Sequence, residues 1–240
     1  MKIIEKIREK QANIGGSRQP CVAFLGDSVT QGCFEIYNDK GIVKTTFYPT
    51  EAYAEKVKAI FAELYPSVPL NVINAGISGD TSWGGLARLE RDVLSYNPNL
   101  VVVCYGLNDA GRGENGIEKY DESLRSIFAK VKDSGAEVIF LTPNLRINDP
   151  DYRCDDKVLE SCRRGISENE RAGWLDKYLD RARKAAADSG VPVCDCNALW
   201  KVMSAIGVDT NRLMSNIANH PTRDMHWMFA YELVKTMFEN

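Results

Sequence analysis

One repeated pattern most limits how this chain can fold. Five short apolar segments occur along it, and each is followed by a turn rich in Gly, Asn or Asp and then by a segment of helical periodicity. Strands of a parallel sheet are continuous apolar runs, because helices bury them on both faces. The alternation therefore predicts a three-layer α/β/α sandwich with a doubly wound, mainly parallel five-stranded sheet of the flavodoxin-like type. The predicted strands are residues 21–25, 70–74, 100–105, 137–141 and 191–194.

The segments between these strands carry helix signals, such as a proline in a first turn at Pro49 and the helix-ending pair Asn97-Pro98. Residues 31–48 and 145–165 show no clear periodicity and are expected to be loop insertions, the second of them part of a substrate wall. We interpret residues 1–240 as a single domain whose N-terminal helix lies within residues 1–16. The predicted helices are residues 1–11, 49–64, 84–96, 116–134, 171–189 and one from about residue 224.

The charge balance argues against two classes of partner. With 30 basic and 33 acidic residues the net charge is -3, so no basic surface for a nucleic-acid backbone or an anionic membrane is expected. No stretch approaches the roughly 18 apolar residues that a membrane span needs. Residues 1–16 mix charges with apolar residues and lack the apolar core of a secretory signal peptide. We therefore expect a soluble, cytoplasmic protein that binds no nucleic acid and has no membrane span.

The cysteines are odd in number and scattered along a chain that can build its own core, which argues against a disulfide framework. Cys194 and Cys196 stand at strand spacing. We interpret them as small buried apolar side chains rather than a metal site, because no second Cys/His pair follows at zinc spacing. The seven cysteines are Cys21, Cys33, Cys104, Cys154, Cys162, Cys194 and Cys196.

Three residues at predicted strand ends can carry chemistry. Ser28 follows the first strand, where a sharp turn into a helix would expose its hydroxyl, although a helix cap explains it equally well. Gly79, after the second strand, can present its backbone N–H to a ligand or serve the turn alone. Asn108, after the third, can donate to a developing negative oxygen or cap a turn. Carboxyl ends of parallel strands meet at one edge, where ligands bind, so we expect the three to lie together.

The chain has two histidines, and histidine is the side chain best suited to take a serine proton near neutral pH. His220 lies in a polar loop, whereas His226 adjoins Trp227 at the start of the last predicted helix. We expect His220 to reach the sheet edge as a general base and His226 to be structural.

The sequence contexts of Ser28, Gly79, Asn108 and His220 resemble the GDSL/SGNH hydrolase superfamily in identity, order and spacing, over residues 21 to about 231. The resemblance implies the SGNH hydrolase fold, with Ser28 as nucleophile, Gly79 and Asn108 as oxyanion donors and His220 as base. It implies no metal or organic cofactor. The matching contexts are Gly26-Asp27-Ser28, Ser78-Gly79-Asp80-Thr81, Gly106-Leu107-Asn108-Asp109 and His220-Pro221.

One position departs from this pattern. The family usually places an aspartate three residues before the histidine, and here that residue is Ile217. The polar candidates nearby are Asn216, Asn219 and Asp224. We expect a neutral acceptor, either Asn216 or a backbone carbonyl, to hold the ring of His220, which should then titrate near its unperturbed pKa of about 6.5.

The resemblance therefore predicts a serine esterase whose partner is a small-molecule ester, with short acyl groups such as acetyl on a carbohydrate preferred. The alternatives within enzymes are a lysophospholipase or thioesterase type of acylhydrolase and an acyltransferase. An alternative of another class is a catalytically weak carbohydrate-binding module on the same fold, which the residue Ile217 favours. The oligomeric state is left open.

Overall fold

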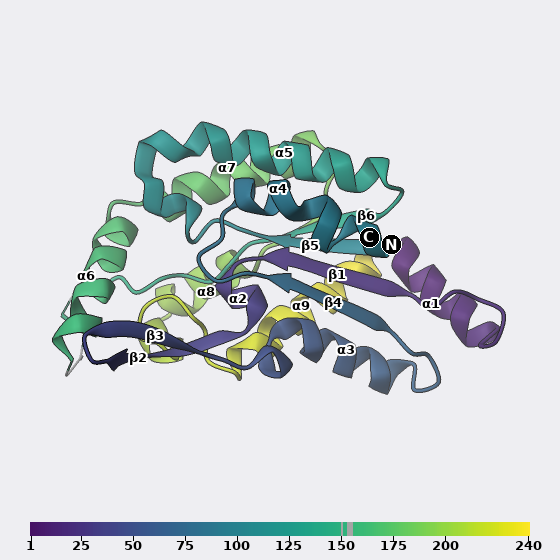
Figure 1. Ribbon diagram of the computed structural model, residues 1–240, viewed down its shortest axis with the longest axis horizontal. Coiled ribbons are helices and arrows are strands. Elements are labelled where there is room, and N and C mark those ends of the chain that lie inside the picture. The colour runs from purple at the N-terminus through teal and green to yellow at the C-terminus, as the bar shows by residue number, and fades with distance from the viewer. Residues whose placement is uncertain (150, 153–155) are drawn as a thin grey trace.

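A five-stranded sheet in which every strand pair is parallel lies at the centre of the molecule (Figure 1). The computed structural model of the chain describes residues 1–149, 151–152 and 156–240. The strand order is the flavodoxin-like one that the sequence predicts, with the second strand of the sheet outside the first. In that order the strands are β4 (Asn71–Gly76), β1 (Cys21–Gly26), β5 (Leu100–Cys104), β6 (Glu137–Leu141) and β7 (Val193–Cys194).

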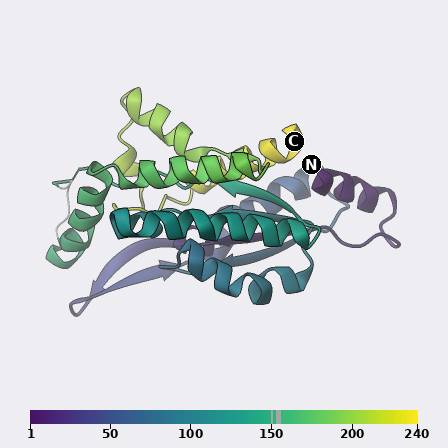
Figure 2. The same cartoon turned by 90° about the horizontal axis from the view of Figure 1, so that it is seen from above.

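Helices cover both faces of the sheet and complete the predicted three layers. On one face lie α4 (Ser82–Asp92), α5 (Ile117–Asp133) and α7 (Trp174–Asp188), side by side in Figure 2. On the other face lie α3 (Tyr53–Leu64) and α9 (Met225–Glu239), with α1 (Lys2–Ala12) and α8 (Cys196–Ala205) against α9. The central strand β5 is buried along its whole length between these layers.

The prediction of an irregular loop at residues 31–48 is wrong. The chain forms the short helix α2 (Ser28–Gln31) and then an antiparallel hairpin of β2 (Cys33–Asp39) and β3 (Ile42–Phe47). Lys40 and Gly41 turn the hairpin with φ of 54° and 89°, a conformation that matches the twist of the two strands. The hairpin lacks a clear apolar alternation, because both strands are largely exposed or half-buried.

The last part of the second predicted insertion, residues 157–165, is helical. The helix α6 (Lys157–Arg171) begins at Asp156, whose carboxylate accepts the N–H groups of Val158 and Leu159. Residue 150 and residues 153–155, which include Cys154, lie outside the described residues. Both α6 and the hairpin lie at the carboxyl end of the sheet (Figure 1), and Asn38 Nδ2 joins them by donating to Asp156 Oδ2 over 2.9 Å.

The other helices occur where the sequence predicts them, with shifted ends. The helix α8 is not predicted, and β7 is short because Asp195 already caps α8 by accepting the N–H of Ala198. In the described part of the chain, four 3-10 helices flank the longer elements. They are η1 (Pro49–Glu51), η2 (Leu94–Tyr96), η3 (Asp109–Gly116) and η4 (Thr210–Leu213).

The cysteines that the structure describes are all free thiols. Cys194 and Cys196 are buried, as expected of small apolar side chains, with their sulfur atoms 3.9 Å apart. Cys162 on α6 is exposed. Within the described ranges, no helix is both long and apolar enough to cross a bilayer.

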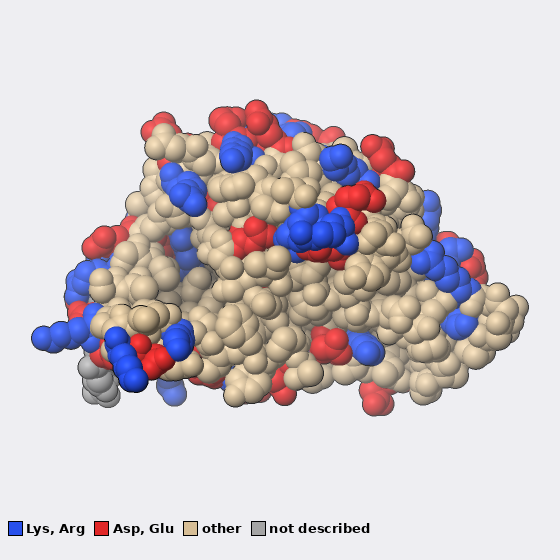
Figure 3. Space-filling view, in the orientation of Figure 1, with Lys and Arg blue, Asp and Glu red and all other residues tan. Residues whose placement is uncertain are grey.

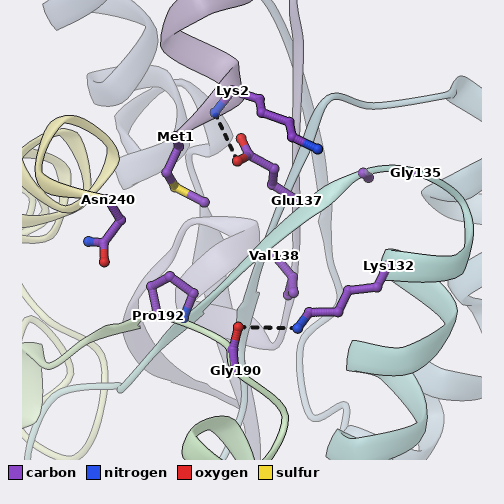
Figure 4. Close-up of a pocket in the computed structure, with 10 residues that line it drawn as sticks. Met1, Lys2, Lys132, Gly135, Glu137, Val138, Gly190, Pro192 and Asn240 are labelled. Carbon is purple, nitrogen blue, oxygen red and sulfur yellow. Dashed lines mark hydrogen bonds between the residues drawn. The ribbon is translucent and has the colours of Figure 1, made fainter.

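A carboxylate on the sheet fixes α1. Glu137, at the start of β6, accepts the N–H of Lys2 over 2.8 Å and that of Ile3 over 2.9 Å. These are two of the N–H groups that the first turn of a helix leaves without partners. The contact closes one side of a pocket at the amino ends of the strands, at the opposite end of the sheet from α6 (Figures 1 and 4).

We expect Glu137→Gln to lower the free energy of unfolding by about 1 kcal/mol, because the amide lacks the charge that favours a helix N-terminus. Urea denaturation of the variant and of Glu122→Gln, an exposed glutamate on α5, measures the difference. Equal stability of the two variants would contradict this role of Glu137.

Candidate active site

Contacts between the strand ends bring the four predicted residues together. Ser28 begins α2 directly after β1, and Gly79 lies in the turn after β4. The two turns meet where Ser78 N donates to Gln31 Oε1 over 2.6 Å. Asn108, after β5, donates its side-chain N–H to the carbonyl of Asp80, next to Gly79, over 2.9 Å. His220 reaches the same edge from the loop before α9.

The side chains of Ser28 and His220 are in direct contact. Ser28 Oγ lies 3.0 Å from His220 Nε2, and the two residues are only 3% and 6% exposed. His220 Nδ1 lies 3.0 Å from the carbonyl oxygen of Phe34. A carbonyl can only accept, so the ring proton of the neutral histidine is on Nδ1. Nε2 is then left as an acceptor facing the serine hydroxyl, which is the tautomer that a general base needs.

An irregularity in the hairpin provides this carbonyl. The register of β2 and β3 shifts between Cys33 and Ile36, so Phe34 lies in a bulge of the ladder. A bulge leaves backbone groups without a partner on the opposite strand. The carbonyl of Phe34 therefore remains available to His220.

None of the three polar side chains considered as acceptors bonds to the ring. Asn216 Oδ1 instead accepts the N–H groups of Ala218, Asn219 and His220, at 2.8 to 3.0 Å. Asn219 Oδ1 accepts from Asn216 Nδ2 over 2.9 Å. Asp224 is exposed in front of α9. Asn216 thus holds the loop rather than the ring, and the described acceptor of Nδ1 is a backbone carbonyl.

Burial sets the pKa of the histidines. It lowers the pKa of His220 to about 4, with a smaller opposing effect from the Phe34 carbonyl. The expected pKa near 6.5 is therefore wrong, because the ring is desolvated and has no anionic partner in the part of the chain that the structure describes. His226 is fully buried, and its Nδ1 accepts the N–H of Tyr53 over 3.0 Å. Its pKa is lowered to about 3, chiefly by burial. This histidine is a packed core side chain.

Three N–H groups around Ser28 can receive a negative oxygen. The first is the N–H of Ser28 at the start of α2, and the second is that of Gly79, which has no acceptor among the described residues. Gly79 has φ of 78°, which favours glycine, and the space where a Cβ would stand is open. The third donor is the amide hydrogen of Asn108 that Asp80 does not use. Such donors stabilise the oxyanion of an acyl-transfer intermediate.

A buried arginine joins the ends of three strands. Arg88, which is 7% exposed, donates to the carbonyls of Gly26 at the end of β1 and Ala75 in β4, over 3.0 and 2.7 Å. It also donates to Asp80 Oδ2 over 2.8 Å and to the hydroxyl of Tyr105, just after β5, over 2.9 Å. Sequence reasoning missed it, although Arg88 stands at a helical position where Leu89 and Gly85 predict a buried face.

Two buried carboxyl groups next to the site were also missed. Asp27 Oδ1 accepts the N–H of Val29 over 3.0 Å, and Asp109 Oδ1 accepts both the N–H and the hydroxyl of Ser82 over 2.8 Å. Burial raises the pKa of Asp27 to about 7, and the charge of Asp109 adds to this. Burial also raises the pKa of Asp109 to about 6. Both carboxyl groups hold the turns that carry the predicted site residues.

We expect Arg88→Lys to lower the free energy of unfolding by roughly 2 to 4 kcal/mol, because a single ammonium cannot reach the carbonyls, the carboxylate and the hydroxyl at once. The matched control is Arg91→Lys on the same helix, whose side chain is 75% exposed and pairs with Asp92. Urea denaturation compares the two variants. An equal loss of unfolding free energy in both would show that the buried contacts of Arg88 add no more stability than those of the exposed Arg91.

The chain is similar in sequence to several known proteins. The profile of the GDSL-like Lipase/Acylhydrolase family matches residues 24–228. The acetylxylan esterase of Geobacillus stearothermophilus is 30% identical over 138 residues, which cover 50% of this chain and 58% of that protein. The esterase TesA of Pseudomonas aeruginosa is 44% identical over 70 residues, 29% of this chain and 34% of that protein. The chain thus matches little more than half the length of the first relative and about a third of the second.

Solved structures share the fold at low identity. A lipase/acylhydrolase from Enterococcus faecalis has a TM-score of 0.66 at 22% identity, over 91% of this chain and 95% of that one. A two-domain esterase active on acetylated mannans has a TM-score of 0.68 at 19% identity, over 99% of this chain and 52% of that one. Since the family profile matches most of its length, this chain belongs to the GDSL-like lipase/acylhydrolase family.

Proposed function

We propose that this chain is a serine esterase that cleaves carboxylic esters through an acyl-enzyme on Ser28. The 3.0 Å contact between Ser28 Oγ and His220 Nε2 carries the proposal, because it pairs a hydroxyl with a base in the required tautomer. Membership of the family supports it. Ser28 is the nucleophile, His220 the general base, and Gly79 and Asn108 donate to the oxyanion together with the N–H of Ser28.

The proposed reaction has two halves. Ser28 Oγ attacks the acyl carbon while His220 Nε2 takes the hydroxyl proton, and the carbonyl oxygen becomes an oxyanion. When the tetrahedral intermediate collapses, the protonated ring gives that proton to the oxygen of the leaving alcohol. Water then adds to the acyl-enzyme by the same route and releases the acid. The cycle consumes one ester and one water and yields one acid and one alcohol.

The ring of His220 acts in this scheme without a carboxylate partner. The carbonyl of Phe34 fixes the tautomer and the orientation of the ring, which are two of the tasks that an aspartate performs in a triad. It supplies no full negative charge to stabilise the imidazolium. We therefore expect a base that stays neutral at low pH and an acylation step slower than that of a complete triad.

Short acyl groups on a carbohydrate are the substrates that we propose. Two similar proteins support this choice, an acetylxylan esterase and a two-domain esterase active on acetylated mannans. An acyltransferase would use the same acyl-enzyme and is recognised by product formed with an added alcohol. A second candidate is a carbohydrate-binding module with little catalysis. It is favoured because the described partner of His220 Nδ1 is a carbonyl rather than a carboxylate. If the wild type cleaves an ester and the variant without Ser28 does not, this candidate is excluded.

We expect Ser28→Ala to retain less than about 1% of the wild-type rate on p-nitrophenyl acetate, because no other hydroxyl can replace the nucleophile. Ser95→Ala, which removes a hydroxyl from the exposed turn η2, should retain full activity. Circular dichroism confirms that both variants fold. A Ser28→Ala variant with substantial activity would place the nucleophile elsewhere.

We expect the acid limb of kcat/KM to lie at about pH 4. Below its pKa the ring of His220 is protonated and cannot accept the hydroxyl proton, so activity falls as pH drops through that value. The limb should remain in Asp27→Asn, which removes the neighbouring group whose pKa is about 7. A half-maximal loss near pH 6.5 in both proteins would show that the ring is solvated rather than buried.

A further inference from the structure

A pocket of about 290 Å³ opens beside the candidate active site, between the turn after β5 and the helix α6. Asn108 lines it on one side and Asn219, the residue before His220, on another. The space-filling view shows the surface hollowed at this end of the molecule, above the hairpin, with basic side-chain atoms in its depth (Figure 3). Gly165 and Asn169 on α6 form the outer wall.

The charge in this pocket is neutralised. Arg146 is 4% exposed, and its Nε donates to Glu170 Oε2 over 2.9 Å. Its two terminal nitrogens donate to the carbonyl of Leu107 and to Asn169 Oδ1 over 3.3 and 2.7 Å. A guanidinium has five N–H groups, so two remain for a ligand. Because Glu170 balances the charge, this wall favours a neutral oxygen over a phosphate or carboxylate.

Amide groups and the thiol of Cys162 supply the remaining polar side chains. Asn169 Nδ2 uses one hydrogen on the carbonyl of Ala110, over 3.2 Å, and keeps the other. Asn219 Nδ2 has no partner among the described residues, since only its Oδ1 is engaged. Donors and acceptors without net charge are complementary to hydroxyl groups. The pocket is also near the lower end of the volumes of small-molecule sites, so it fits one ring rather than a long acyl chain.

We propose that this pocket is the subsite for the alcohol half of the ester and that it binds a single pyranose ring through its hydroxyls. The inference rests on the proposed function, since His220 Nε2 must reach the oxygen of the leaving alcohol. Asn219, which lines the pocket, adjoins that histidine, and this adjacency assigns the pocket to the alcohol rather than to the acyl group. The helix α6, through Gly165 and Asn169, then determines specificity.

Three acetyl esters test the assignment because they differ only in the alcohol: methyl 2-O-acetyl-β-D-xylopyranoside, cyclohexyl acetate and methyl acetate. Asn169→Leu removes the contacts of Asn169 with Arg146 and Ala110 whichever ester is bound, and only the sugar also loses a hydrogen bond. It should therefore lower kcat/KM about tenfold more for the sugar ester than for cyclohexyl acetate. A Cβ at Gly165 meets open space, so Gly165→Leu fills the pocket without disturbing the fold. It should lower kcat/KM for both ring esters and spare methyl acetate.

Ser161→Leu, at an exposed position of α6 outside the pocket, is the matched control and should change none of the three rates. Equal losses on all three esters in Gly165→Leu, or a loss in Asn169→Leu that is no larger on the sugar ester than on cyclohexyl acetate, would overturn the proposal. Calorimetric titration with methyl β-D-xylopyranoside separates it from the esterase activity. If the wild type cleaves no ester but binds this sugar, and Gly165→Leu abolishes the binding, the subsite stands and the esterase proposal fails. An absence of both cleavage and binding overturns both.

Discussion

The geometry of the candidate site depends on the hydrogen bonds and the ion pair that the guanidinium of Arg88 makes. The guanidinium joins the backbone of β1 and β4 to the side chain that follows β5, and its partner Asp80 follows Gly79 and supplies the carbonyl that binds Asn108. Each of these strands ends in a turn that carries one of the predicted residues. An arginine fork suits this task because its N–H groups are fixed in one plane. Donors held in this way before a substrate arrives need no reorganisation during the reaction.

The histidine loop depends on a different set of contacts. Asn216 binds three successive N–H groups, and Asn144 Nδ2 donates to the carbonyl of Asn219 over 2.9 Å. Ile217, at the position where the family usually has aspartate, has φ of 51° within this turn. The acceptor for the ring comes from the hairpin instead, through the bulge at Phe34. The hairpin thus orients the ring in place of the missing carboxylate, but it supplies no negative charge.

The sequence predicts the strands of the sheet and the helical layers because apolar runs and helical periods are local signals of burial. It also predicts that Ser28, Gly79 and Asn108 lie together, since strand ends of a parallel sheet share one edge. The polar loop around His220 predicts that this histidine reaches the same edge. It does not predict the hairpin, whose strands are half-exposed and lack alternation. The acceptor for His220 carries no signal either, because any residue has a backbone carbonyl.

The pKa of His220 shows why a candidate site residue can be predicted from the sequence while its pKa cannot. Its identity follows from its position in the chain, but its pKa follows from burial, which depends on segments distant in sequence. Arg88 illustrates the same point for packing. Its role requires the positions of three strands, and the sequence around it predicts only that its face of α4 is buried.

In the proposed mechanism Ser28 is a nucleophile activated by a histidine that stays neutral at low pH. Mass measurement after incubation with p-nitrophenyl diethyl phosphate, at pH 5 and at pH 8, tests this mechanism. We expect one diethylphosphoryl group on the peptide that contains Ser28 at both pH values, and none in His220→Ala over the same time. An unlabelled wild-type protein under conditions that label a reference esterase, or an adduct on another residue, would contradict it.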